Sequence, residues 1–302
     1  MINIYNKQLE TFILVADAGS FNKAAEKMYI TSTAVIKQIN SLERELDLKL
    51  FIRTNQGLTL TKSGESLYHD AKYIMQYCKD SVTRAKNAMN KSDNVIRIGT
   101  SSMTPGQFLV ELWPRIHELL PDIKFELIPF DNTPENAREI LKNLGDNIDI
   151  VAGIFDNTLL EYRKCAGLEI KVEPIRAAVS IYHPLASKES LSVFDLYGEN
   201  LMIIKRGNFC SVDNLRDDLW QNHPQINIID FDFYSLDVFN RCENSNNILM
   251  AVDAWDNAHP LLKILPVEWD YALPYGILYS PDPSPVIRRF LTAVTATFKT
   301  NK

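Results

Sequence analysis

The stretch FILVADAGSFNKAAEKMYITSTAVIKQINSLERELDLKLFIRTNQGLTLTKSG, residues 12–64, decides the fold of the N-terminal part of this chain. Apolar side chains in and just before it recur with helical spacing, which predicts a helix over residues 7–17 and a second over residues 21–28. Gly19 is expected to end the first helix and Ser20 to cap the second. Thr31 or Ser32 can cap a third helix, whose apolar face consists of Val35, Ile39, Leu42 and Leu46.

A β-hairpin is predicted directly after the third helix. Two short alternating segments, residues 50–51 and 58–60, flank Asn55-Gln56-Gly57, which is a turn sequence. Three helices followed by such a wing are typical of the winged helix-turn-helix, whose third helix enters the major groove of DNA. Helical periodicity alone fits a three-helix bundle with a hairpin and no DNA equally well.

Five short motifs separate these two interpretations. In chain order they are A-x-x-G-S-F, A-A-E, A-V-x-K-Q-I-x-x-L-E, L-F-x-R and L-T-x-S-G, and they span residues 16–64. With these motifs the stretch closely resembles the N-terminal DNA-binding domain of LysR-type transcriptional regulators. The resemblance implies double-stranded operator or promoter DNA as a partner, with RNA polymerase as a further candidate.

The resemblance also implies which residues contact DNA. Carried over by position, they are Ser32, Thr33, Ile36, Lys37 and Gln38 in the third helix, and Arg53 and Thr54 beside the wing. Lysine and arginine can neutralise phosphates or donate to guanine, whereas Ile36 offers only an apolar contact, such as one to a thymine methyl. The family usually has glutamine in place of Ser32 and serine in place of Ile36, so a different base preference is expected.

Residues 62–91 are expected to form one long helix, because they contain no proline and only one glycine. Apolar residues recur along it at heptad spacing and form a seam of Leu67, Ala71, Ile74, Cys78 and Ala85. A helix with one apolar stripe is not stable alone in water and must pack on a partner. Resemblance to the family implies that this linker pairs two subunits into a dimer or tetramer; the alternative is a helix packed on its own domain.

The net charge of −6 is unevenly distributed along the chain. Residues 1–91 carry 13 Lys and Arg against 9 Asp and Glu, a net charge of +4. Residues 92–302 carry 19 against 29, a net charge of −10. A mildly basic N-terminal region on an acidic body suits a DNA reader with a separate cytosolic module.

The acidic body alternates strand and helix patterns. Strand-like segments at residues 95–99, 125–128 and 148–154 enclose helical patterns at 108–120 and 135–144, which predicts a mostly parallel sheet. A second α/β block follows, with strands at 175–182, 201–204 and 226–231 and helices at 212–221 and 235–243. A strand at 275–279 and a helix at 286–298 close the chain.

The segments VIRIGTSS, LPDIKFELIPF, NIDIVAGI and HPLA resemble, in that order, the LysR-type effector domain. The expected fold class is therefore α/β: a winged helix-turn-helix over residues 1–61, a linker or dimerisation helix over 62–91, and an effector-binding domain over 92–302. The resemblance implies two subdomains hinged like a periplasmic binding protein. Subdomain I is expected at 92–163 and 267–302, and subdomain II at 164–266.

The cleft between these subdomains is the expected site for a small-molecule effector, because open α/β sheets bind ligands at the carboxyl ends of their strands. Three loops follow such ends, and their candidate effector-binding residues are Ser101, Ser102, Thr104, Phe130, Asp131, Asn132, Lys205, Arg206, Asn208, Phe209 and Cys210. Lys205 or Arg206 is the expected charge partner of the effector. The alternative for each residue is ordinary capping and turn chemistry.

Other classes of function have less support in the sequence. No H-E-x-x-H, G-x-S-x-G, Walker-type or G-x-G-x-x-G motif is present, so neither an enzyme nor a cofactor is predicted. The four cysteines form no C-x-x-C pair, so neither a metal site nor a disulfide is expected, and a reduced cytoplasm fits. Two alternatives remain: a thiol-based redox sensor acting through Cys210, and a ligand-binding protein with a degenerate DNA-binding head.

The N-terminus MINIYNKQLE has neither a basic start nor a long apolar core, so no signal peptide and no membrane partner are predicted.

Overall fold

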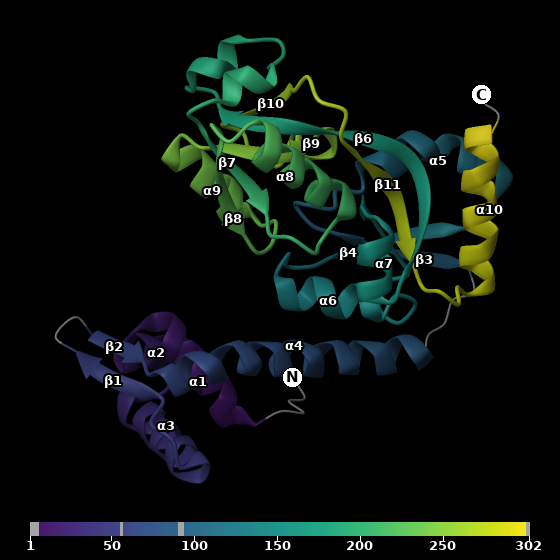
Figure 1. Cartoon of the computed structure of the whole chain (residues 1–302). Helices are drawn as coiled ribbons and strands as arrows, with labels where there is room; N and C mark the ends of the chain where they lie inside the picture. Colours follow the sequence, from purple (N-terminus) through teal and green to yellow (C-terminus); the bar gives the residue numbers. More distant parts are fainter. Residues whose placement is uncertain (1–5, 55–56, 90–93, 300–302) are drawn as a thin grey trace. The chain divides into compact units, whose positions relative to one another are not determined.

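The computed structural model of the protein describes residues 6–54, 57–89 and 94–299, which fall into two units, Met1–Asn90 and Lys91–Lys302. Side chains are described in these ranges except at 53–54, 87–89, 107–111 and 299. The first unit contains helices α1 (Lys7–Ala18), α2 (Phe21–Met28) and α3 (Ser32–Leu46), strands β1 (Phe51–Thr54) and β2 (Gly57–Leu60), and helix α4 (Lys62–Met89) (Figure 1).

The ends of the first three helices follow from local capping chemistry. Gly19 ends α1 in the left-handed conformation, with φ 60°, which costs glycine little. Thr31 caps α3, because its side chain accepts from the amide N–H of Ala34. Ser20 stands at the N-cap of α2 as predicted, but its hydroxyl makes no capping hydrogen bond.

One apolar core joins the three helices to the hairpin. Phe12, Val15, Val35 and Leu50 are fully buried in it, and the rings of Phe12 and Phe51 meet edge to face at 5.4 Å between centroids. The predicted apolar face of α3 ends earlier than the periodicity indicates, because Leu46 is 43% exposed. The face of α3 that packs on the core therefore stops before the last turn of the helix.

The predicted seam of α4 divides into two parts. Ala71 is fully buried in the core of the first unit, and Leu67 packs against that core. Ile74 is 43% exposed, Cys78 is half-buried and Ala85 is exposed. The N-terminal part of the seam therefore packs on its own unit, as the alternative interpretation expected, and the part from Ile74 onward is left uncovered.

In residues 94–299 the strands form one nine-stranded mixed sheet, ordered β4-β3-β5-β11-β6-β9-β7-β8 with β10 beside β6. Its two ends are parallel, and the two long strands that connect them, β6 and β11, run antiparallel to their neighbours. The prediction of a mostly parallel sheet thus applies to the two ends alone. The strands are β3 (Val95–Thr100), β4 (Lys124–Pro129), β5 (Ile150–Ile154), β6 (Ala166–Ser180), β7 (Asn200–Ile204), β8 (Asn227–Phe231), β9 (Ile248–Val252), β10 (Leu262–Pro266) and β11 (Ala272–Tyr279).

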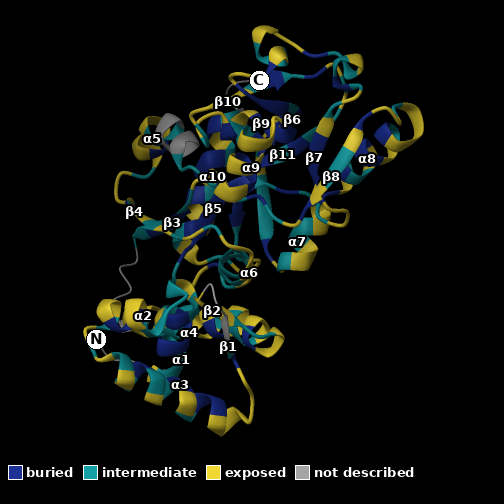
Figure 2. Ribbon diagram, turned by 90° about the vertical axis from the view of Figure 1, so that its left-hand side faces the viewer, coloured by how far each residue is buried: buried dark blue, intermediate teal, exposed yellow. Residues whose placement is uncertain are grey.

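Helices flank both ends of the sheet, and strands β5, β7, β9 and β11 are mostly buried while the outer faces of the helices are exposed (Figure 2). They are α5 (Gln107–Leu119), α6 (Pro134–Lys142), α7 (Asn157–Arg163), α8 (Cys210–Asn222), α9 (Leu236–Ser245) and α10 (Pro285–Lys299), with short 3₁₀ helices at Pro184–Ser187, Val193–Leu196 and Asp253–Trp255. We call the end with β3, β4 and β5 the first half of the sheet, and the end with β7, β8 and β9 the second half.

Four elements lie outside the predicted ones: α7, β9, β10 and the first part of β6. Strand β9 is buried at every residue, and a strand covered on both faces shows no alternation for a sequence pattern to detect. Helix α7 has seven residues, too few for helical periodicity to be visible.

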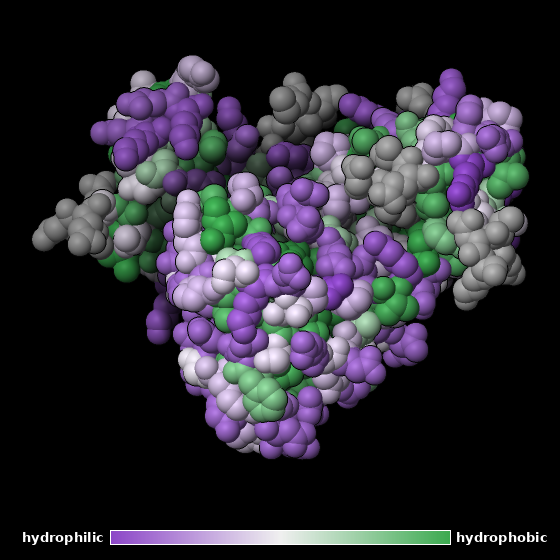
Figure 3. Space-filling view, turned by 90° about the horizontal axis from the view of Figure 1, so that it is seen from above, coloured by the Kyte–Doolittle hydropathy of each residue, from purple (hydrophilic) through white to green (hydrophobic). Residues whose placement is uncertain are grey.

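Figure 3 shows hydrophilic side chains over much of one face of the molecule, with hydrophobic side chains exposed between them. No helix in the described ranges is both long enough and apolar enough to span a bilayer.

Candidate functional site

The first turns of α3 present polar side chains on the face opposite the core. Val35 and Ile39 are buried and fix the rotation of the helix, so that Thr33 and Lys37 are exposed while Ser32 and Ile36 are half-buried. An exposed ammonium and an exposed hydroxyl at the start of such a helix can donate hydrogen bonds to phosphates or base edges.

Gln38 lies differently from the other predicted DNA-binding residues of α3. Its side-chain oxygen accepts a hydrogen bond from the hydroxyl of Thr11 on α1, so this end of the amide joins two helices of the head. Arg53 and Thr54 belong to β1, but their side chains lie outside the described part of the chain.

The wing is held against the helices by backbone contacts. The N–H of Leu58 donates to the carbonyl of Gly19 at 3.1 Å, which brings the start of β2 next to the turn between α1 and α2. Ser20, Asn22, Ile36 and Gly57 line an open groove at this junction. The start of α2, the start of α3 and the wing therefore converge on one surface.

Glu43 is a residue that sequence reasoning missed. Its carboxylate is only 7% exposed and accepts hydrogen bonds from the N–H of Leu50 at 2.8 Å, the N–H of Phe51 at 3.3 Å and the ammonium of Lys49 at 2.6 Å. Burial by itself raises the pKa of Glu43, but Lys49 and the two amide groups together lower it below its ordinary value. Glu43 thus fixes the start of the wing to the third helix.

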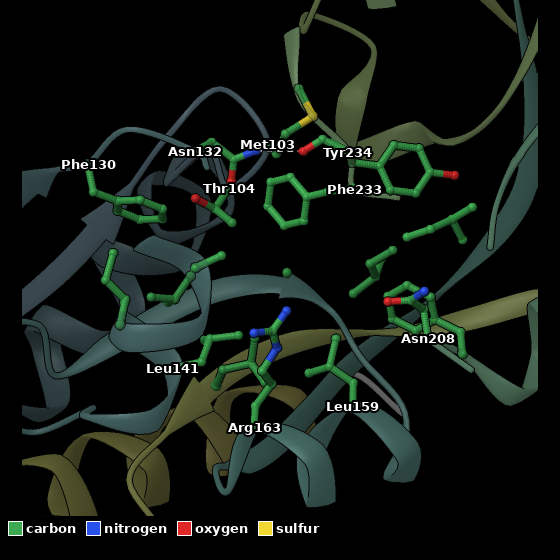
Figure 4. Close-up of a pocket in the computed structure, with 18 of the residues that line it drawn as sticks. Met103, Thr104, Phe130, Asn132, Leu141, Leu159, Arg163, Asn208, Phe233 and Tyr234 are labelled. Atoms are coloured by element: carbon green, nitrogen blue, oxygen red, sulfur yellow. Dashed lines mark hydrogen bonds between the residues drawn. The ribbon is translucent and has the colours of Figure 1, made fainter. Parts of the chain in front are cut away.

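A cavity of about 130 Å³ lies in the second unit where the two halves of the sheet face each other (Figure 4). The first half contributes Phe130, Ile140, Leu141, Val151, Leu159 and Leu278, and the second half contributes Ile204, Phe209, Phe233, Tyr234 and Trp255. The lining is mostly apolar, so it suits a ligand with an apolar body.

Of the eleven predicted effector-binding residues, five line this cavity: Thr104, Phe130, Asn132, Asn208 and Phe209. The other six, Ser101, Ser102, Asp131, Lys205, Arg206 and Cys210, are not among its lining residues.

The two expected charge partners of an effector have partners in the protein. The ammonium of Lys205 lies 2.6 Å from the carboxylate of Asp232, and the guanidinium of Arg206 lies 2.5 Å from that of Asp217. Ser101 takes part in turn chemistry, because its hydroxyl lies 2.8 Å from that of Thr104. Lys205 and Arg206 are therefore each paired with a nearby carboxylate, and the sequence could not indicate this pairing.

Among the described residues, hydrogen bonds cross the cleft between the two halves at three places. The amide of Asn132 donates to the carbonyl of Tyr234 at 2.7 Å, and the indole N–H of Trp255 donates to the carbonyl of Met103 at 3.1 Å. The backbone N–H of Cys210 donates to the carboxylate of Asp156 at 2.5 Å. These bonds hold the halves together around the cavity.

Arg163, the last residue of α7, is the one charged residue among the described cavity-lining residues, and sequence reasoning missed it. Figure 4 shows its guanidinium pointing into the cavity, where the Nη1 atom is buried and has no hydrogen-bond partner. Burial lowers the pKa of Arg163, the nearby Tyr162 raises it, and the charge of Arg138 lowers it further. Only the position of α7 in the fold could reveal this residue, because nothing in the sequence around it forms a motif.

Two of the four cysteines, Cys165 and Cys242, are poorly placed for a thiol switch. Burial raises the pKa of Cys165 to about 11 and that of Cys242 to about 12, so both thiols stay protonated near neutral pH. Cys210 is exposed. In the described ranges no group of three or more His, Cys, Asp or Glu side chains is arranged to hold a metal ion.

Comparison with known proteins assigns both units. The bacterial regulatory helix-turn-helix family named lysR matches residues 6–65, and the LysR substrate binding domain matches residues 90–299. The chain therefore belongs to the LysR family.

Individual relatives are distant. The chain is 28% identical over 203 residues to YvbU of Bacillus subtilis, an uncharacterized HTH-type transcriptional regulator, with 66% of each chain covered. It is 26% identical over 193 residues to a probable RuBisCO transcriptional regulator of Trichormus variabilis, covering 63% of this chain and 55% of that one. The matched segments span between about half and two thirds of these relatives' own length.

Solved structures show the same fold. The crystal structure of CbnR, a LysR family transcriptional regulator, has a TM-score of 0.54 at 18% identity and covers 96% of this chain and 98% of its own. Full-length CbnR in complex with its target DNA has a TM-score of 0.50 at 17% identity, covering 96% of this chain and 99% of its own.

Proposed function

We propose that this protein is a sequence-specific DNA-binding transcription regulator controlled by a small-molecule effector, and that it acts by binding rather than by catalysis. The observation that carries this proposal is the presence, in one chain of the LysR family, of a winged helix-turn-helix and a mostly apolar cavity between two halves of an α/β sheet. A cavity of this kind suits recognition of a small ligand, and the head suits recognition of DNA.

The proposed DNA contacts fall into two classes. Lys37 neutralises a phosphate or donates to a guanine, and Thr33 donates from its hydroxyl, since both side chains are exposed on the first turns of α3. Ser32 and Ile36 lie beside them and discriminate bases by a hydroxyl and an apolar contact. Gln38, Arg53 and Thr54 complete the proposed set, with Gln38 reduced to the part of its amide that Thr11 leaves available.

The proposed domain arrangement follows the expected boundaries, with residues 1–61 as the DNA-binding domain and 62–91 as the linker. The first half of the sheet with α10 corresponds to subdomain I, residues 92–163 and 267–302, and the second half to subdomain II, residues 164–266. An effector acts by favouring one arrangement of the two subdomains over another, because only a difference in affinity between two states can shift their populations.

Self-association is proposed to use the uncovered part of α4. Ile74 and Tyr77 are exposed on this helix, and Cys78 and Ala85 continue the seam beyond the residues that pack on the head. Burying such a stripe against a second copy would remove apolar surface from water. A dimer or tetramer in the cytoplasm, with RNA polymerase as a further partner at the promoter, is the proposed working form.

Fluorescence anisotropy tests the DNA-binding part of this proposal. The full chain is titrated onto labelled promoter DNA from beside its own gene, across a salt series, with random DNA of equal length as the control. We expect tight, salt-sensitive binding that Lys37→Ala weakens, with the slope of log affinity against log salt smaller by about 1. The matched control is Arg44→Ala, an exposed cation nearer the end of the same helix.

Binding to this promoter that is no tighter than binding to random DNA would count against sequence-specific recognition there. Equal losses in Lys37→Ala and Arg44→Ala would show that the start of α3 is not the reading surface.

A further inference from the structure

We propose that the effector of this protein is an apolar monocarboxylate, bound with its carboxylate on Arg163 and its apolar body among the hydrophobic residues of the cavity. This inference rests on the proposed function, because it assigns a chemical class to the effector of that same site. It departs from the expectation that Lys205 or Arg206 supplies the positive charge.

The first argument is that one nitrogen of the Arg163 guanidinium, Nη1, is buried without a hydrogen-bond partner. Among the described cavity-lining residues, Arg163 is the only one with a buried side-chain polar atom that lacks a hydrogen-bond partner. Buried polar groups in native proteins are almost always paired, and an unpaired cation is the most costly case. An anion that enters the cavity would supply the missing partner.

The second argument is that no carboxylate of the described chain neutralises Arg163. Its contact at 5.1 Å is with the ring of Tyr162, which is not an anion. Asp156, at the other end of the same helix, uses one carboxylate oxygen to cap α7 and the other to accept from the N–H of Cys210. Arg138 adds a second positive charge near Arg163. The local field therefore favours an anion and disfavours an amine.

The third argument is that the other polar side chains described in the cavity each make a hydrogen bond within the protein. The amide of Asn132 donates to the carbonyl of Tyr234, and that of Asn208 donates to the carbonyl of Lys205. The hydroxyl of Tyr234 donates to the carbonyl of Met250 at 2.8 Å, and that of Thr104 pairs with Ser101. Arg163 is the one charged side chain among the described residues that line the cavity, and most of the others are apolar.

The size of the cavity limits the rest of the ligand. A cavity of about 130 Å³ is comparable with engineered apolar cavities of about 150 Å³ that bind benzene. The apolar body is therefore about one six-membered ring, or an aliphatic chain of about six carbons. A dicarboxylate would bury a second charge without a partner, and inorganic phosphate would leave the apolar walls unfilled.

Carboxylate is preferred over other anions on geometric grounds. A guanidinium offers two parallel N–H donors that match the two oxygens of a carboxylate, and such paired hydrogen bonds to a charged acceptor are among the stronger ones in proteins. Phe130 and Phe233, on opposite halves of the sheet, provide rings against which a flat or extended apolar group can pack.

Isothermal titration calorimetry with the full-length protein tests the assignment. The probes are benzoate and hexanoate, with benzyl alcohol as the uncharged counterpart, benzylamine as the cationic one, and succinate and inorganic phosphate as polar anions. We expect benzoate or hexanoate to bind in the micromolar to millimolar range and benzyl alcohol at least about tenfold more weakly. Benzylamine, succinate and phosphate are expected not to bind.

Variants assign the charge to one residue. Arg163→Gln should lower benzoate or hexanoate affinity by at least about tenfold while leaving that of benzyl alcohol within about twofold, because the loss is specific to the ligand's charge. Arg163→Lys should recover part of the carboxylate affinity. Arg288→Gln is the control, since Arg288 pairs with Asp282 and does not line the cavity, and it should stay within about twofold of the parent protein.

The comparison of benzoate with benzyl alcohol needs no variant, so the test stands even if Arg163→Gln folds poorly. Equal affinity for the two probes, binding of neither acid, or full benzoate affinity in Arg163→Gln would overturn the assignment. Anisotropy with promoter DNA on the same samples separates the two proposals. If the protein binds DNA but none of the acids, only the ligand class is refuted. If it binds an acid but not DNA, the ligand class is supported and the regulator function fails.

Discussion

Glu43 joins the third helix of the head to the wing, and replacing it should loosen the wing without removing any group that contacts DNA. Glu43→Ala deletes the acceptor of the Leu50 N–H, and Leu50 is fully buried, so water cannot take the place of the lost oxygen. Glu43→Gln keeps one acceptor oxygen at the same distance along the side chain and removes only the negative charge.

The expected magnitude follows from these contacts. Hydrogen bonds to a charged group contribute about 1.5–3 kcal/mol, and an orphaned buried donor costs about 1–3 kcal/mol. The ion pair with Lys49 adds little, ~0–1 kcal/mol, because the Lys49 side chain is 79% exposed. We therefore expect Glu43→Ala to lower the free energy of opening the wing by about 2 kcal/mol and Glu43→Gln by about 1 kcal/mol.

Hydrogen–deuterium exchange of the full chain measures this directly. At about 1.4 kcal/mol per tenfold change, Glu43→Ala should reduce the protection of the Leu50 amide by about thirtyfold and Glu43→Gln by about fivefold. Exchange in residues 94–299 should not change, because those residues belong to the other unit. The local measurement avoids a global unfolding curve, which is not two-state for a chain of two units.

The same group makes the wing sensitive to acid. The pKa of Glu43 is lowered in the folded chain, since Lys49 and the two amide groups outweigh the effect of burial. Its contribution to stability is therefore complete above the unfolded-state pKa, about 4.3, and is lost as pH falls through the lower folded-state pKa. This acid-dependent loss of protection should be absent in Glu43→Gln.

Unchanged protection of Leu50 in Glu43→Ala, or an equal loss in the alanine and glutamine variants, would refute the argument that the carboxylate holds the wing.

Three further outcomes are expected. Gly276→Ala should yield misfolded or strongly destabilised protein by circular dichroism, because an added Cβ would lie 1.9 Å from a backbone carbonyl of β6, and a folded variant would disprove that contact. Ile74→Lys should weaken self-association in sedimentation velocity while Lys79→Ala does not, and equal sedimentation of both would exclude this face of α4 as the interface. Iodoacetamide near pH 8 should leave Cys165 and Cys242 unmodified until the protein is denatured, since burial raises their pKa values to about 11 and about 12. Mass spectrometry reads the labelling, and labelling of either cysteine in the native protein would contradict their burial.

The fold of the head can be predicted from the amino-acid sequence, because the signals that specify it are local. Apolar side chains three and four residues apart place Phe12, Val35 and Ile39 on buried faces whatever the rest of the chain does. Gly19 and Thr31 end and cap helices through backbone groups within a few residues of themselves, so the helix ends could be predicted from the neighbouring residues. The family resemblance rests on this same short range of residues 16–64.

The tertiary structure alone decided which polar groups of the second unit have partners. Lys205 and Arg206 stand in a loop that sequence reasoning associated with the effector, but the fold places Asp232 and Asp217 beside them. Arg163 stands in a seven-residue helix without a motif, and the fold places its guanidinium in the cavity without a carboxylate. Whether a charge is neutralised depends on residues distant along the chain, because electrostatic pairing acts through space and the sheet order sets which segments meet.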